Sequence, residues 1–190
     1  MFYFLLFLLA FVLSVACTKV VQKAAIAFRL LDVPGALSRK AHGLPTPLLG
    51  GLAIFASFFS LLFLLAFLTD WPEGRQIALP QLIGVFIGAA FLMLGGFLDD
   101  KYDLKPHLQI IWPMAAVLAV VFSGVQVERI TNPFGGVLSL APWVSAVFII
   151  FWLLTLIYTT KFLDGLDGLV SGLLFIGSAV IFSLSLFNRY

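Results

Sequence analysis

The chain has 190 residues, of which 62% are hydrophobic and 11% are charged, and its formal net charge is +2. Soluble domains carry about 25% charged residues, so this composition excludes an ordinary soluble protein and indicates a multi-pass membrane protein without nucleic-acid partners. The one cysteine, Cys17, excludes a disulfide framework within the chain. We therefore expect one all-α membrane domain over residues 1–190.

Six apolar runs predict a polytopic bundle of membrane-spanning helices, since one span needs about 20 apolar residues. The expected spans are residues 2–21, 48–68, 79–98, 108–125, 144–160 and 169–187. These runs are too long for barrel strands and do not alternate as strands would. Pro113 is expected to kink the fourth span. Residues 130–137 are expected to form a turn or short hairpin without chemistry.

Lysine and arginine are distributed unevenly between the connections. Eight of them lie between runs one and two, three and four, and five and six, and three lie on the opposite side. The positive-inside rule therefore places the first group in the cytoplasm and both termini outside. Six acidic residues share that predicted cytoplasmic side: Asp32, Asp99, Asp100, Asp103, Asp164 and Asp167. Acidic residues do not set topology, so a polar catalytic face is the simplest explanation for this gathering.

The first predicted cytoplasmic connection carries donors suited to phosphate oxygens, namely Arg39, Lys40 and His42. Pro45-Thr46-Pro47 would hold the connection rigid as it re-enters the membrane, and Gly50-Gly51 would permit tight helix packing there. Ordinary positive-inside anchoring is the alternative. It would explain Arg39 and Lys40, but it explains neither His42 nor the Pro-Thr-Pro turn.

The second connection contains the adjacent carboxylates of Asp99 and Asp100 at a predicted helix end. Two such carboxylates repel each other unless a cation or a proton relieves them. Mg²⁺ is suited to this task, because it takes one or two carboxylates together with phosphate oxygens. The alternative is a solvated helix terminus with Lys101 as the local partner.

The third connection doubles an Asp-Gly pair, at Asp164-Gly165 and Asp167-Gly168. On a helical turn, carboxylates three residues apart point the same way, and the glycines let a ligand approach closely. Ionisable groups close to a bilayer are expensive and usually functional. The pattern predicts a site for Mg²⁺ and a phosphate-bearing ligand. A helix-ending turn with solvated carboxylates is the alternative.

Taken in order, these stretches resemble the polyprenyl-phosphate N-acetylhexosamine-1-phosphate transferases, a bacterial glycosyltransferase 4 family. The matching residues are Asp32-Val33-Pro34, Arg39-Lys40, His42, Pro45-Thr46-Pro47, Gly50-Gly51, Asp99-Asp100, Asp164 and Asp167. The resemblance implies a multi-pass enzyme of the bacterial plasma membrane with its active site at the cytoplasmic face. Such enzymes use Mg²⁺, or Mn²⁺ in its place, to move a sugar-1-phosphate from a UDP-sugar onto undecaprenyl or another polyprenyl phosphate, releasing UMP, in cell-envelope polysaccharide synthesis. The resemblance also allows a homodimer.

The resemblance implies roles for individual residues. Asp99 or Asp100 would deprotonate or orient the acceptor phosphate, and Asp164 and Asp167 would help to hold Mg²⁺ and the nucleotide end. Five further residues would contact phosphate or substrate: Arg39, Lys40, His42, Asp103 and Lys161. Asp103 stands where the muramoyl-pentapeptide branch typically has lysine, which favours the N-acetylglucosamine-1-phosphate branch.

The chain departs from the family pattern in two respects. Tyr158 and Lys161 occupy positions where the family usually has asparagine, and the chain stops at Tyr190 before two further cytoplasmic loops of the family. We therefore expect the N-terminal portion of a longer family fold. A truncated, non-catalytic remnant or subunit of the same fold is the alternative. A small transporter would predict mid-membrane charges and an inverted repeat, and the sequence shows neither.

Overall fold

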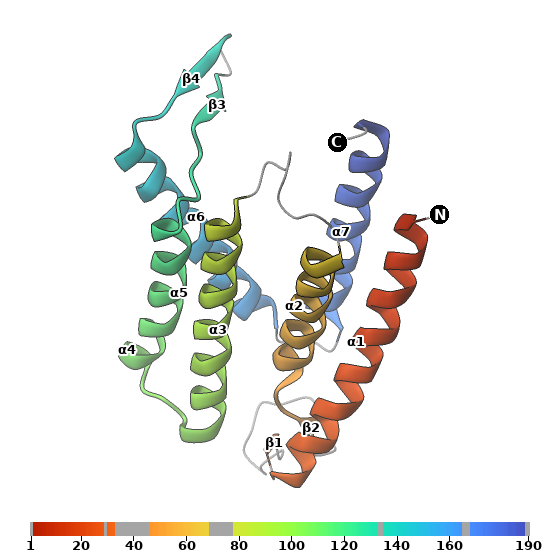
Figure 1. The fold of residues 1–190 in the computed structure, drawn as a ribbon. Coiled ribbons are helices and arrows are strands. Elements are labelled where there is room, and N and C mark those ends of the chain that lie inside the picture. The colour runs from red at the N-terminus through yellow and green to blue at the C-terminus, as the bar shows by residue number, and fades with distance from the viewer. Residues whose placement is uncertain are drawn as a thin grey trace. The chain divides into compact units, whose positions relative to one another are not determined.

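A computed structural model describes residues 2–28, 30–32, 46–68, 78–132, 135–164 and 168–188 of the chain. The chain forms two compact units, Met1–Gln126 and Val127–Tyr190, and each is described by itself. Figure 1 shows the order of the helices and strands along the chain. The expectation of one membrane domain over all 190 residues stays a prediction.

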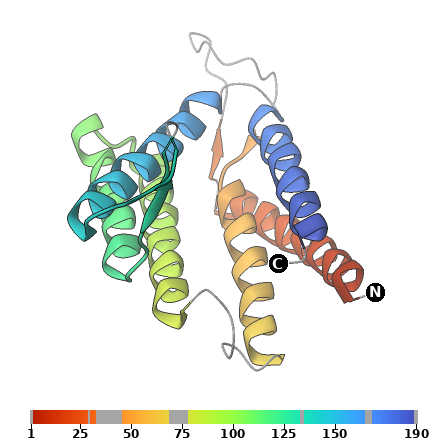
Figure 2. The same ribbon diagram turned by 90° about the horizontal axis from the view of Figure 1, so that it is seen from above.

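The first unit consists of helices and one short strand pair. Its elements are α1 (Phe2–Ala27), β1 (Leu31–Asp32), β2 (Thr46–Pro47), α2 (Gly50–Leu68), α3 (Leu79–Tyr102), α4 (Pro106–Gln109) and α5 (Ile111–Phe122). Strands β1 and β2 pair antiparallel, with Leu31 opposite Pro47, and so bring the start of α2 back beside the end of α1. Within this unit α1 packs on α2, and α3 packs on α5 (Figures 1 and 2).

The second unit begins with a hairpin and continues as two helices. Its elements are β3 (Arg129–Thr131), β4 (Val137–Ser139), α6 (Pro142–Leu163) and α7 (Leu169–Asn188). The strands pair antiparallel, and the turn between them uses Gly135 and Gly136 at φ values of 109° and 84°, which glycine adopts readily. This confirms the hairpin predicted at residues 130–137.

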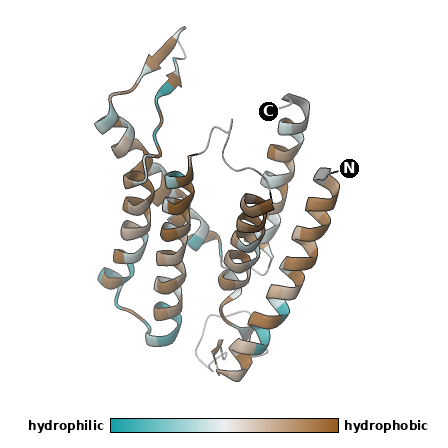
Figure 3. Cartoon of the chain, in the orientation of Figure 1, coloured by the Kyte–Doolittle hydropathy of each residue, from teal (hydrophilic) through white to brown (hydrophobic). Residues whose placement is uncertain are grey.

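The helices confirm an all-α polytopic membrane bundle. Of the described residues, four helices are long and apolar enough to span a membrane: Phe4–Ala27, Gly50–Leu68, Leu79–Tyr102 and Pro142–Leu163. The apolar helical segments Pro106–Phe122 and Leu169–Ser185 are shorter. Figure 3 shows hydrophobic colour along the helices and hydrophilic colour mainly near their ends and on the hairpin. Large apolar side chains are widely exposed, as Phe67 is at 90%, and this suits contact with lipid rather than with water.

The fourth predicted span is interrupted three residues before the expected position. Helix α4 ends at Gln109 and α5 begins at Ile111, so the break lies at Ile110 rather than at Pro113. Proline has no N–H to donate to the carbonyl four residues earlier, which here belongs to Gln109. Pro113 instead occupies the first turn of α5, where an N–H would have no partner within the helix.

Glycines on α3 determine how closely α5 approaches. A Cβ placed at Gly84 would lie 2.2 Å from the Ser123 Cβ, and one at Gly95 would lie 2.4 Å from the Trp112 Cβ. A Cβ at Gly88 would lie 2.8 Å from the carbonyl oxygen of Ala116. Small residues let helices in a membrane approach closely, and van der Waals packing then holds them together. All three glycines are buried, so the α3–α5 contact requires them.

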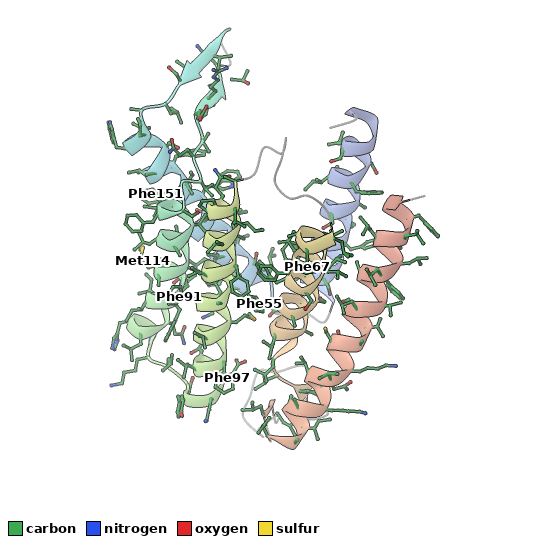
Figure 4. The ribbon with its side chains drawn as sticks, viewed as in Figure 1. Phe55, Phe67, Phe91, Phe97, Met114 and Phe151 are labelled. Atoms are coloured by element: carbon green, nitrogen blue, oxygen red, sulfur yellow. The ribbon has the colours of Figure 1, made fainter. Side chains whose placement is uncertain are left out.

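The contact between α2 and α3 is made by larger side chains. Phe86 of α3 packs its ring against Phe59 and Phe55 of α2, with centroid distances of 4.9 and 5.5 Å. Figure 4 shows Phe55 projecting from α2 toward α3. A Cβ at Gly51 would lie 2.9 Å from the Met93 Cε, whereas nothing lies within 4 Å of one at Gly50. The tight packing predicted for this glycine pair is therefore confirmed at Gly51 alone.

Two neighbouring glycines test whether the α3–α5 contact limits stability. Gly95→Ala should lower the free energy of unfolding by about 1–3 kcal/mol, because the new methyl group would overlap Trp112. Gly96→Ala should be neutral or stabilising by up to about 1 kcal/mol, since nothing lies near its Cβ and alanine favours helices. Thermal unfolding in detergent, followed by tryptophan fluorescence, measures both. Equal stability of the two variants would contradict the packing argument.

Candidate functional site

The last turn of α3 carries both predicted catalytic carboxylates. Asp99 and Asp100 lie within this turn, and Asp103 follows the end of the helix. Asp103 adopts a left-handed conformation, with φ 48° and ψ 66°, and its backbone N–H donates to the Asp99 carbonyl oxygen at 2.9 Å. The chain thus turns out of the helix at Asp103, three residues after Asp100.

Gln109 of α4 contacts this turn from the next element along the chain. Its Nε2 donates to Oδ1 of Asp99 at 2.7 Å and to the carbonyl oxygen of Leu104 at 2.9 Å. Asp99 is half-buried, whereas the side chain of Asp100 is exposed. Sequence reasoning missed Gln109. The sequence did contain a signal, because Gln109 is an uncharged polar residue at the start of an apolar run. Such a side chain needs a hydrogen-bond partner when it is partly buried.

Lys101, the local partner considered from the sequence, makes contacts with aromatic rings. Its Nζ lies 5.8 Å from the ring centroid of Phe97 and 5.1 Å from that of Tyr102. Figure 4 labels Phe97 in this final part of α3. At these distances an ammonium group is attracted by the ring faces. The Lys101 charge is therefore held on the outer surface of the helix end, where its side chain is exposed.

The doubled Asp-Gly motif begins where α6 ends, in the second unit. The helix stops at Leu163, and Asp164 caps it with φ −78° and ψ 46°, its N–H donating to the Thr160 carbonyl at 3.2 Å. The expectation that Asp164 lies within a helical turn is therefore wrong, because the helix has already ended. Asp167 lies outside the described residues. Gly168, at φ 78°, leads into α7 in a conformation that favours glycine.

Lys161 lies in the last turn of α6, with its side chain exposed. A cation is favourable at a helix C-terminus, because the last carbonyl groups carry partial negative charge. Tyr158 lies one turn earlier and is half-buried. These two residues occupy the positions where the sequence departs from the pattern it resembles, and the helix end accommodates both.

The remaining predicted residues cannot be placed together. Arg39, Lys40 and His42 lie outside the described residues, as Asp167 does. Asp99, Asp100 and Asp103 belong to the first unit, whereas Asp164 and Lys161 belong to the second. The predicted meeting of the two acidic stretches therefore stays a prediction.

A small hollow lies where the first connection re-enters the bundle. It has a volume of about 240 Å³ and is lined by residues of α1, β2 and α2: Thr18, Val21, Gln22, Pro47, Leu48, Gly50 and Ala53. Pro47 and Gly50 belong to the two motifs predicted to shape this connection. The hollow is mostly apolar, with Thr18 and Gln22 as its polar side chains.

The carboxylates of the described residues have the donor chemistry for a magnesium ion that shares its ligands with a substrate. Within the described ranges, no group of three or more His, Cys, Asp or Glu side chains could hold a metal ion by itself. Mg²⁺ does not require such a group, because it is usually bound by one or two carboxylates together with substrate phosphates. Asp99 and Asp100 at the end of α3 and Asp164 at the end of α6 are carboxylates of this kind.

Comparison with known protein families assigns the chain. Residues 82–190, more than half of the chain, match the model of glycosyl transferase family 4. The chain belongs to glycosyl transferase family 4. The matched region contains the Asp99-Asp100 pair, Gln109 and the doubled Asp-Gly motif, so the membership includes both acidic stretches described above.

Curated relatives of this family member are named as phosphosugar transferases. The chain is 27% identical over 95% of its length to a probable undecaprenyl-phosphate N-acetylglucosaminyl 1-phosphate transferase of Bacillus subtilis, and covers 47% of that protein. It is 32% identical over 92% of its length to the undecaprenyl-phosphate alpha-N-acetylglucosaminyl 1-phosphate transferase of Thermotoga maritima, and covers 50% of it. A decaprenyl-phosphate N-acetylglucosaminephosphotransferase of Mycobacterium tuberculosis is 29% identical over 78% of the chain, which covers 37% of it.

The chain spans about half the length of the first two curated relatives that it matches. No solved structure matches it significantly. The family assignment therefore rests on sequence, and the fold described above comes from the structure of this chain.

Two substitutions at Asp103 separate the effect of its left-handed backbone on stability from the effect of its carboxylate. Asp103→Gly and Asp103→Ala both remove the carboxylate, but only alanine suffers from the positive φ. The glycine variant should be more stable than the alanine variant by about 1 kcal/mol. Urea or thermal unfolding of the two variants in detergent measures this difference. An alanine variant as stable as the glycine variant would show that the turn relaxes.

Proposed function

We propose that this chain acts in the transfer of N-acetylglucosamine-1-phosphate from a UDP-sugar to a polyprenyl phosphate in bacterial cell-envelope polysaccharide synthesis. The observation that supports this proposal is its similarity, over 92% and 95% of its length, to two proteins named for that transfer. The carboxylates at the end of α3 support it further, because a lipid phosphate at a membrane surface would meet polar groups at helix ends.

The reaction forms one phosphorus–oxygen bond and breaks another. A phosphate oxygen of the polyprenyl phosphate attacks the phosphorus that carries the sugar, and the bond to the UMP oxygen breaks. Such transfers need positioning and charge neutralisation more than a protein nucleophile. Asp99 or Asp100 would orient or deprotonate the acceptor phosphate, so that its oxygen faces the phosphorus of the sugar donor.

Other residues would hold the charged groups of the substrates. Arg39, Lys40 and His42 would donate hydrogen bonds to phosphate oxygens. Asp164 and Asp167 would hold Mg²⁺, which when bound supplies positive charge to the diphosphate. Asp103 and Lys161 would contact substrate at the two helix ends. A homodimer is part of the proposal, because the family resemblance allows one.

A transfer assay tests the activity of the chain. Membranes containing the chain should convert radiolabelled UDP-N-acetylglucosamine and undecaprenyl phosphate into a lipid-linked product when Mg²⁺ is present. EDTA should abolish the product, and added Mg²⁺ should restore it. The assay needs a folded chain, which detergent size-exclusion chromatography establishes. A folded chain that forms no labelled lipid would contradict this function for these 190 residues.

Single substitutions test the acidic residues. Asp100→Asn and Asp164→Asn should each lower the rate of transfer by about 100-fold or more. A carboxamide has nearly the same shape as a carboxylate, but it is neutral and can neither neutralise a cation nor accept a proton from a phosphate. Glu128→Gln is the matched control, because it makes the same chemical change at an exposed residue beside the hairpin. Near-normal transfer by either aspartate variant would contradict its assigned role.

The cytoplasmic position of the site is also part of the proposal and can be measured. In a Cys17→Ser background, Lys105→Cys and Leu138→Cys place single thiols after the end of α3 and on β4. The positive-inside rule places the first in the cytoplasm and the second outside. A membrane-impermeant maleimide should therefore label position 138 in intact cells, and position 105 only after permeabilisation. The reverse pattern would invert the topology.

A further inference from the structure

The side-chain amide of Gln109 joins α4 to the end of α3 that carries the predicted catalytic carboxylates. Nε2 of Gln109 donates to Oδ1 of Asp99 at 2.7 Å and to the Leu104 carbonyl oxygen at 2.9 Å. We propose that Gln109 is a positioning residue, which fixes the carboxylate of Asp99 for the transfer reaction. This inference rests on the proposed function, and it adds a residue to which the sequence analysis assigned no role.

Asp99 is held through both its backbone and its side chain. Its carbonyl oxygen accepts the N–H of Asp103 at 2.9 Å, where the chain turns out of the helix. Its carboxylate accepts the amide of Gln109. A carboxylate held in one orientation before a substrate arrives needs less reorganisation when the reaction occurs, and small displacements of a reacting group can slow a reaction about 100-fold.

The packing of α3 against the α4–α5 segment brings Gln109 to Asp99. Gly95 contacts Trp112 so closely that a Cβ at Gly95 would overlap its side chain. Asp99 lies four residues after Gly95, and Gln109 lies three residues before Trp112. Three or four residues make about one helical turn. The α3 helix and the α4–α5 segment run antiparallel. One helical turn beyond the contact between Gly95 and Trp112, Gln109 therefore lies opposite Asp99.

Gln109 also distinguishes Asp99 from its neighbour. Successive residues of a helix point about 100° apart, so Asp99 and Asp100 cannot face the same neighbouring segment. Asp99 is half-buried against α4, and Asp100 is exposed. The amide donor is neutral, so it orients the Asp99 carboxylate without adding an opposite full charge beside it. Gln109 thus acts on one member of the pair.

The chain offers a matched control at the other end of the same helix pair. Gln81 at the start of α3 accepts the N–H of Ala78 at 3.0 Å and donates through Nε2 to the Gly124 carbonyl oxygen at 3.2 Å. Like Gln109, it joins the α3 end to the segment that contains α5. Gln109→Met and Gln81→Met each remove one such amide and keep a side chain of similar length.

Steady-state transfer in membranes is the first measurement. Gln109→Met should lower kcat about 10- to 100-fold, because the Asp99 carboxylate that acts on the acceptor phosphate loses its orientation. The KM for UDP-N-acetylglucosamine should stay within twofold, because the binding site of the sugar donor is unchanged. Gln81→Met should keep kcat within twofold of the wild-type value. A normal kcat for Gln109→Met, or an equal loss in Gln81→Met, would overturn the proposal.

Chemical labelling of carboxylates provides a readout that does not need turnover. Carbodiimide with an amine tag, followed by mass spectrometry, reports Asp99 and Asp100 separately, and Asp164 serves as the internal reference. Labelling of Asp99 should rise several-fold in Gln109→Met and stay unchanged in Gln81→Met. Unchanged labelling of Asp99 in Gln109→Met overturns the inference. If the wild-type chain makes no product but this labelling pattern appears, the proposed transfer fails and the positioning of Asp99 stands.

Discussion

The close approach of α3 and α5 is the constraint on which the first unit depends. In lipid, apolar side chains gain little by leaving one apolar surface for another, so packing must hold the helices together. Gly84, Gly88 and Gly95 remove side-chain bulk at three points along α3 and bring its backbone against α5. Ala116, whose carbonyl oxygen lies 2.8 Å from a Cβ placed at Gly88, is only 3% exposed in this contact.

Polar groups then tie the two ends of that apolar pair. Gln81 bonds Gly124 at one end, and Gln109 bonds Asp99 and Leu104 at the other. Uniform apolar packing does not fix the alignment of two helices, because a helix of similar side chains can slide or rotate against its neighbour. Hydrogen bonds near the helix ends fix this alignment. The glycines set the register of α3 against α5. Through the bond between Gln109 and Asp99, one turn beyond Gly95, this register also determines the position of the Asp99 carboxylate.

Much of the fold could be predicted from the sequence because hydropathy is a local property. All six apolar runs are helical in the structure. Their ends were less predictable: α1 continues to Ala27 and α3 to Tyr102, because polar residues extend a helix beyond the apolar stretch that identifies it. The break at Ile110 and the end of α6 at Leu163 depend on backbone bonding, which residue patterns describe only in part. Gln109 was missed because its bond to Asp99 arises from tertiary pairing.

The same reasoning explains why the sequence left Asp99 and Asp100 interchangeable. An Asp-Asp pair contains no information about which carboxylate faces a neighbouring element, since that depends on how the helix is rotated about its axis. The rotation of α3 is determined by the face that carries Gly84, Gly88 and Gly95, because this face must lie against α5. Asp99 lies one turn beyond Gly95 on that face, and Asp100 is displaced by about 100° from it. The glycines of the packed face thus decide which carboxylate Gln109 can reach.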